Sequence, residues 1–161
     1  MDLFGQHYCK ADAKGRVTLP TALKNQLMSV LNDDFILKRA IFQRCLELYP
    51  KSTFQKALAE VKRERRISRE YDLFYRKYMA GVKPDVRVDA DTGRFQIPKD
   101  LLEFAGITKE VSLHCGDGCI EIWDKQQYEE VLKEGDAVYP DVAESIFNKP
   151  NTEPKKVGED E

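Results

Sequence analysis

The sequence has no apolar run near the roughly 20 residues that a membrane-spanning helix needs. It has only two histidines and one tryptophan in 161 residues, and it lacks both a Gly-rich phosphate loop and a Ser-nucleophile motif. The first residues, MDLFGQHYCK, do not pair a basic segment with an apolar one, so we expect no secretion. These absences argue against a membrane protein and an enzyme. We expect no catalytic residue, no cofactor and no small-molecule substrate.

Charge is unevenly distributed along a chain whose formal net charge is only -2. Residues 124–161 carry 11 acidic residues against 5 lysines, which leaves 17 acidic and 21 basic residues in the first 123. The larger part of the chain is therefore mildly basic, which permits binding to a polyanion such as nucleic acid, while the C-terminal part is acidic.

Two blocks of sequence occur twice in the same order. ADAKGRVTLP (11–20) matches ADTGRFQIP (90–98), with Gly-Arg and Pro at a step of 78 residues. Further along, CLELYPKSTFQKAL (45–58) matches CIEIWDKQQYEEVL (119–132) at a step of 74. The change of step means that the first copy has four extra residues, most simply between 29 and 44. We interpret the chain as an internal duplication.

Each copy predicts the order strand, turn, strand, helix, strand, strand, helix. Gly15 and Gly93 suit the tight turn, because glycine adopts positive φ without a Cβ clash. Pro20 and Pro98 fit the first turn of the helix that follows, and Gly106 suits the end of the second such helix. The strands are expected at 6–10, 17–19, 35–39 and 45–49, and again at 85–89, 95–97, 109–115 and 119–123, with further helices starting near 51 and 125.

A helical stripe lies between the copies, with Ser68 suited to cap its start and Gly81 its end. We interpret the stripe as packing between the repeats; it consists of Ile67, Tyr71, Phe74, Tyr75 and Tyr78. The basic run KRERR (62–66) is interleaved with glutamates, which favours a solvated helix face over a phosphate site. We divide the chain into a first unit (1–62), a connecting amphipathic helix (63–81), a second unit (82–134) and an acidic, largely disordered tail (135–161).

The segment HCGDGC (114–119) raises the alternative of a metal or redox site. The usual zinc-ligand spacings are absent, and Cys119 corresponds to Cys45 at an equivalent strand position of the first copy. This correspondence favours a small buried apolar side chain over a ligand. Because no secretion signal is present, we expect all four cysteines to be reduced thiols, and we expect no metal.

The repeated motifs carry a family resemblance over about residues 4–134. The combination of DAKGRVTLP, CLELYP, GRFQIPKDLLEFAGITKEV and IEIWDKQQYEE is similar to the MraZ family. The resemblance implies an α+β, mainly β fold: tandem AbrB-like swapped-hairpin β-barrel units in one chain, related by a pseudo-two-fold internal repeat, with packing helices. It also implies a ring-shaped homo-oligomer that binds double-stranded DNA in the cytoplasm, on the nucleoid.

The family's hallmark is Asp-x-x-x-Arg in each half. The first copy matches it with Asp12 and Arg16, but position 90, four before Arg94, is Ala. We interpret the second loop as carrying a one-residue insertion that leaves Asp89 in the role of the family's Asp, with Asp91 as the alternative.

The resemblance implies that Arg16 and Arg94 contact DNA, since a guanidinium can fork onto guanine or clamp a phosphate. Lys14 and Lys10 would add phosphate contacts. We expect Asp12 and Asp89, with Gly15 and Gly93, to orient the loops. The implied function is a transcriptional regulator, usually a repressor, that binds short direct repeats upstream of its own gene in the division and cell-wall gene cluster. The alternative is an oligomeric interaction or scaffold module that has lost operator binding.

Overall fold

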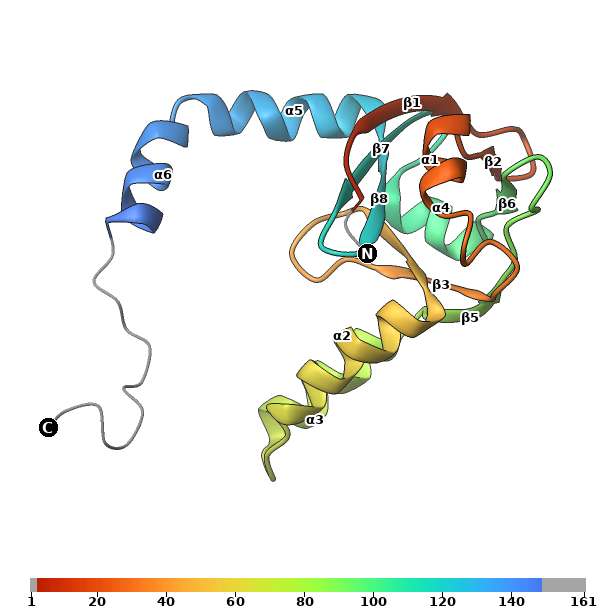
Figure 1. The fold of residues 1–161 in the computed structure, drawn as a ribbon. Coiled ribbons are helices and arrows are strands. Elements are labelled where there is room, and N and C mark those ends of the chain that lie inside the picture. Colours follow the sequence, from red (N-terminus) through yellow and green to blue (C-terminus); the bar gives the residue numbers. More distant parts are fainter. Residues whose placement is uncertain (1–2, 149–161) are drawn as a thin grey trace, which may run out of the picture. The chain divides into compact units, whose positions relative to one another are not determined.

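The computed structural model describes residues 3–148, which divide into a compact unit up to Tyr128 and a second unit from Glu129 onward. The first unit contains an antiparallel six-stranded sheet and a two-stranded ribbon, with helices around them (Figure 1). The sheet order is β1-β7-β8-β4-β3-β5, and β2 pairs with β6. The expected α+β fold on antiparallel strands is confirmed. The sheet consists of β1 (Gln6–Lys10), β3 (Phe35–Arg39), β4 (Leu46–Pro50), β5 (Lys83–Val86), β7 (Glu110–Gly116) and β8 (Cys119–Asp124); the ribbon consists of β2 (Arg16–Thr18) and β6 (Arg94–Gln96).

The two repeats are interleaved. Strand β1 of the first copy pairs with β7 of the second, and β5 of the second copy pairs with β3 of the first. At the centre, Glu47 lies opposite Glu121, and in the ribbon Val17 lies opposite Phe95. Both pairs join residues that correspond in the two copies, so one pseudo-two-fold axis passes through the sheet and the ribbon. The expected internal symmetry is therefore present, and neither copy is a separate body.

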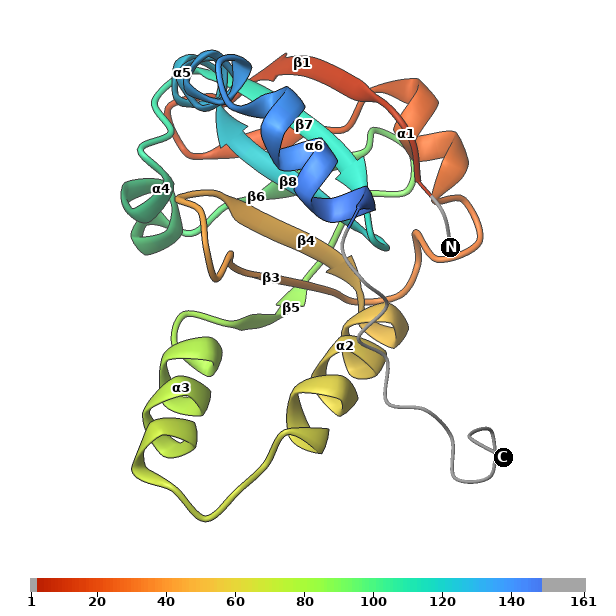
Figure 2. The ribbon, with the colours of Figure 1, turned by 90° about the vertical axis from the view of Figure 1, so that its left-hand side faces the viewer.

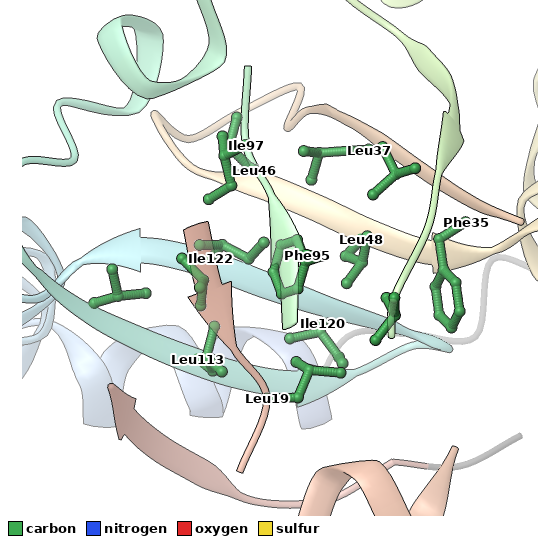
Figure 3. Close-up of a cluster of buried hydrophobic side chains, with 14 of the residues drawn as sticks. Leu19, Phe35, Leu37, Leu46, Leu48, Phe95, Ile97, Leu113, Ile120 and Ile122 are labelled. Carbon is green, nitrogen blue, oxygen red and sulfur yellow. The ribbon is translucent and has the colours of Figure 1, made fainter. Parts of the chain in front are cut away.

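The main core lies between the ribbon and one face of the sheet. Val17 and Phe95 point inward from the ribbon and are 0% and 2% exposed. The side chains they meet come from alternate positions of the sheet strands, as period-two packing requires. Figure 3 shows this cluster, which includes Leu19, Phe35, Leu37, Leu46, Leu48, Ile97, Leu113, Ile120 and Ile122. Burying so many aliphatic side chains, each worth about 1.5–3 kcal/mol, fixes the ribbon against the sheet.

Short helices follow the two ribbon strands. Helices α1 (Thr21–Gln26) and α4 (Lys99–Ala105) begin one residue after Pro20 and Pro98, which are N-caps instead of first-turn residues. Their ψ angles near 150° are extended, so the helical conformation starts at the next residue. Gly106 ends α4 in the left-handed region, as expected. The ribbon strands themselves begin one residue earlier than predicted, at the two arginines.

The hairpins follow the sequence pattern. Strand β3 pairs with β4, and β7 pairs with β8 through a two-residue turn. In that turn Asp117 and Gly118 have φ of 47° and 78°, the double positive φ of a type I′ hairpin. Strand β5 differs from the expected 85–89: it starts earlier, at Lys83, and ends at Val86.

Two helices extend from the first half of the sheet as an arm, and Figure 2 shows them side by side with the connecting loop at the far end. Helix α2 (Lys51–Arg63) begins directly after β4, and α3 (Arg69–Met79) is capped by Ser68, whose Oγ accepts the Tyr71 N–H at 3.0 Å. At the base of the arm a second cluster covers the outer face of the sheet. It consists of Ile36, Tyr49, Phe54, Tyr78 and Cys119. Of the aromatic stripe only Tyr78 is buried, so most of the stripe does not pack between the repeats as we expected.

The second unit is helical over its described part. Helix α5 (Lys125–Asp136) runs across the boundary, and α6 (Tyr139–Phe147) follows after two residues. We expected residues 135–161 to be largely disordered, but α6 lies within that range. Pro140 in its first turn and the helical spacing of Tyr139, Val142 and Ile146 account for it. The remaining part of the expected tail, 149–161, lies outside the described residues. Within residues 3–148 no helix has the length and hydrophobicity that crossing a membrane would require.

Candidate nucleic-acid interface

The two Gly-Arg turns lie on one surface because β2 and β6 pair. Arg16 lies opposite Gln96, and Arg94 lies opposite Thr18. Since Val17 and Phe95 point into the core, the alternate residues of both strands point outward. The two arginines are diagonal neighbours, and such pairs in an antiparallel ladder have Cα atoms about 7–8 Å apart. The ribbon thus exposes two guanidinium groups, one hydroxyl and one amide.

Each turn also accepts a hydrogen bond from the strand leaving the other turn. The N–H of Ile97 donates to the Gly15 carbonyl at 2.9 Å, and the N–H of Leu19 donates to the Gly93 carbonyl at 2.8 Å. Gly15 and Gly93 have φ of 80° and 78°. At Gly15 a Cβ would lie 2.7 Å from the Ile97 carbonyl oxygen. Positive φ and this close approach both require glycine, and the cross-links hold the turns in a fixed relation.

In the first turn a single aspartate organises backbone and side chain together. Asp12 Oδ1 accepts the N–H groups of Lys14 and Arg16, each at 2.9 Å. Its Oδ2 accepts Nε of Arg16 at 2.5 Å. The backbone N–H of Arg16, followed by the Arg16 side chain and the Lys14 N–H, holds the pKa of the Asp12 carboxyl below its usual value.

In the second turn Asp89 is in the corresponding position. Its N–H donates to the Arg94 carbonyl at 2.9 Å, as that of Asp12 does to Arg16 at 3.0 Å. Because the turn is one residue longer, Asp89 Oδ1 accepts the N–H groups of Asp91 and Thr92. These hydrogen bonds, chiefly that from the Thr92 N–H, lower the pKa of the Asp89 carboxyl. Among residues 3–148 the Arg94 guanidinium has no hydrogen bond or ion pair. The Asp91 side chain makes none of these turn contacts, so the geometry favours Asp89 over Asp91.

The two lysines predicted for this surface differ in position. Lys14 belongs to the first turn, where its carbonyl accepts Nε2 of Gln96 at 3.1 Å and its side chain is exposed. Lys10 is not on the ribbon: it is exposed at the end of β1, opposite Glu110 of β7. Sequence reasoning missed Thr18 and Gln96 on the outer face. The alternation of Arg-Val-Thr and Arg-Phe-Gln was the signal for both, once Val17 and Phe95 are taken as core.

Interleaved hairpin repeats about a pseudo-two-fold axis, with paired Gly-Arg turns on an exposed ribbon, define the AbrB-like swapped-hairpin class. A family model described as "MraZ protein, putative antitoxin-like" matches residues 3–77 and 81–145, one match per repeat. The chain therefore belongs to the MraZ family.

Similar proteins carry the name transcriptional regulator MraZ. The one from Christiangramia forsetii is 43% identical over 91% of this chain and 94% of its own length. The one from Flavobacterium psychrophilum is 39% identical over 92% of this chain and 94% of its own length. The one from Bacteroides fragilis is 35% identical over 81% of this chain and 82% of its own length. The second match of the family model extends to residue 145, which includes most of α6.

Proposed function

We propose that this protein is a sequence-specific DNA-binding transcriptional regulator whose β2–β6 ribbon enters the major groove. The pairing that brings Arg16 and Arg94 onto one exposed ribbon carries the proposal. The major groove, about 12 Å wide, admits a two-stranded β-ribbon. A diagonal spacing of about 7–8 Å between the two arginines is close to two steps of about 3.4 Å along DNA.

The side chains on the outer face have the chemistry of base readout. Arginine pairs with guanine O6 and N7, glutamine pairs with adenine, and the threonine methyl group contacts thymine. Arg94, without an ion-pair partner in the described part of the chain, is available for such a contact. Asp12 restricts the orientation of Arg16, and bidentate recognition benefits from a restricted guanidinium. Lys14 and Lys10 would contribute contacts to phosphates that do not depend on sequence.

One ribbon supplies few contacts, so we propose that the protein binds as a ring-shaped homo-oligomer to short direct repeats. Linked copies raise the overall affinity without new contacts, provided that several ribbons can reach DNA at once. The proposed targets are repeats upstream of the protein's own gene in the division and cell-wall gene cluster, with repression as the outcome and the nucleoid as the cellular location. The relatives' common name supports a regulator rather than an enzyme.

A gel-shift titration against the DNA upstream of the gene tests the proposal. We expect Arg16→Ala and Arg94→Ala each to weaken specific binding about tenfold or more, because a bidentate base contact contributes about 1–3 kcal/mol. Arg87→Ala is the matched control, since Arg87 is exposed and lies near Asp34 outside the ribbon. Binding of wild-type protein that neither ribbon substitution weakens would contradict the assignment. A stable oligomer with no affinity for the upstream DNA would favour the scaffold alternative.

A further inference from the structure

The α2–α3 arm has a groove at its tip that the ribbon does not use. The groove has a volume of about 900 Å³. It lies where α2 ends and α3 begins, at the connecting loop whose backbone Figure 2 shows. We call it the tip groove. It is lined by Lys62, Arg65, Arg66, Ile67, Ser68, Arg69, Tyr71, Asp72 and Tyr75.

The tip groove has a surplus of positive charge. Among the described residues Lys62, Arg65 and Arg69 have no ion-pair partner, and Arg66 has only a 3.6 Å contact with Glu64. The acid in the lining, Asp72, already accepts Nε of Arg76 at 3.0 Å. Three of the four cations therefore have no ion-pair partner among the described residues, and an acidic partner would gain from all four.

The tip groove also exposes apolar surface. Ile67 is fully exposed, and the rings of Tyr71 and Tyr75 stack at 6.0 Å between centroids, half-buried beside it. Ile67 lies in the loop between α2 and α3, and a basic loop that was only solvated would gain nothing from a fully exposed isoleucine. Apolar surface surrounded by cations is the complement of an amphipathic helix with acidic flanks.

Helix α6 is an amphipathic helix of this kind. Tyr139, Val142 and Ile146 share one face and are 73%, 48% and 64% exposed, while Asp141 and Glu144 lie on the other side at about 100° per residue. Residues 129–148 contain six acidic residues and one lysine. The second unit thus presents an unpartnered apolar face in an acidic setting.

We propose that α6 of one copy binds in the tip groove of a second copy. Complementary charge and matching apolar faces carry this inference, which rests on the proposed self-association and supplies its contact. Each chain has one groove and one helix, so the contact is heterologous and passes from copy to copy. Such a contact closes into a ring when the rotation between copies permits. The members of the KRERR run that line the groove, Lys62, Arg65 and Arg66, would then serve assembly and not DNA.

Charge reversal in two separate variants tests the contact. The groove variant is Arg65→Glu/Arg66→Glu/Arg69→Glu, and the helix variant is Asp141→Lys/Glu144→Lys. Each places like charges together, so we expect either variant alone to need about a hundredfold more protein to assemble, measured by analytical ultracentrifugation. Mixed in equal amounts, the two variants should assemble again, because each supplies the surface that matches the other.

Matched controls separate this contact from changes in net charge. Lys56→Glu/Arg63→Glu alters α2 outside the groove, and Glu129→Lys/Glu130→Lys alters α5; both should assemble like wild type. Circular dichroism establishes that every variant is folded. Mixing that does not restore assembly would overturn the proposal, as would a groove variant that assembles normally. A groove variant that keeps its oligomeric state but loses affinity for a random-sequence duplex would assign the arm to DNA instead. None of these outcomes depends on operator binding by Arg16 and Arg94, so the two proposals fail separately.

Discussion

In the first Gly-Arg turn Asp12 holds the Arg16 side chain at 2.5 Å, whereas in the second turn Asp89 accepts the N–H groups of Asp91 and Thr92 and does not hold the Arg94 side chain. One inserted residue makes the difference. The backbone frame tolerates it, because both aspartates still donate their own N–H to the arginine carbonyl. The ion pair between the aspartate and arginine side chains is lost, because the longer turn directs the Asp89 carboxylate to the N–H groups of Asp91 and Thr92. A hairpin can thus keep its fold while it changes how its arginine is held.

The two halves of the sheet also differ at its outer face. In the first half Lys38, only 1% exposed, donates to Glu47 at 3.1 Å and lies over the Tyr78 ring. At the symmetry-related place in the second half His114 lies opposite Glu121, and burial, helped by His7, lowers its pKa from 6.5 to about 4. The first half buries an ion pair, whereas the second keeps a neutral imidazole.

The largest expected difference between the halves concerns this buried pair. Lys38→Ala should lower the free energy of unfolding by about 3 kcal/mol, because it leaves the partly buried Glu47 carboxylate without its cation. His114→Ala should cost less, since Glu121 keeps the Trp123 Nε1 donor at 3.0 Å. Urea denaturation measures both. The double variant Lys38→Met/Glu47→Gln should recover most of the loss. Equal losses for Lys38→Ala and His114→Ala would contradict the contrast.

Substitution of the two turn glycines should lower stability by smaller amounts, which differ between the two turns. Gly15→Ala places a Cβ 2.7 Å from the Ile97 carbonyl oxygen and from Leu102 Cδ1, whereas Gly93→Ala leaves 3.1 Å to the Leu19 carbonyl oxygen. Both variants pay about 1 kcal/mol for positive φ, and the overlap at Gly15 adds about another 1 kcal/mol. In thermal melts Gly15→Ala should therefore have the lower melting temperature of the two variants. A lower melting temperature for Gly93→Ala would count against the turn geometry.

Acidification should affect the second half through His114. Its folded pKa lies below the unfolded value of 6.5, so the unfolded chain binds a proton first as the pH falls. The stabilisation is complete above pH 6.5 and declines as pH falls from 6.5 toward about 4. After allowance for partial solvent exposure, we expect a loss of about 1 kcal/mol between pH 7 and pH 5. His114→Gln should lose less stability over this interval, measured by urea denaturation at each pH. If the free energy of unfolding of this variant fell as steeply with pH as that of the wild type, His114 would not be its source.

The smallest effect tests the turns directly. In DNA-binding titrations Arg16→Ala should cost about twofold more in the wild-type background than beside Asp12→Asn, because the carboxylate orients the guanidinium. The corresponding cycle for Asp89 and Arg94 should show no coupling. Deleting Ala90 would shorten the second turn to the length of the first, and coupling should then appear. A coupled Asp89–Arg94 pair in the unaltered chain would remove the distinction between the turns.

Much of the frame follows from local sequence. The duplicated blocks predict the hairpins, because period-two apolar residues such as Leu46 and Leu48 define a buried face wherever the strand pairs. Gly15, Gly93 and Gly106 predict their own positive φ. The strand and helix boundaries were wrong by a residue near Pro20 and Pro98, since the same proline fits an N-cap and a first turn. Helix α6 was missed because an overall acidic composition concealed a short apolar stripe.

The sequence by itself determined the repeat, the order of elements and the two Gly-Arg turns, because each rests on contacts between near neighbours in the chain. Only the tertiary structure decided which strands pair across the repeats. The pairing of β2 with β6 joins residues 76 to 80 apart, and burial of Val17 with Phe95 selects it over pairing within one copy. That choice places Thr18 and Gln96 beside the arginines. The tertiary structure also buries Lys38, because the Tyr78 ring of α3, 40 residues further along the chain, lies over its ammonium group.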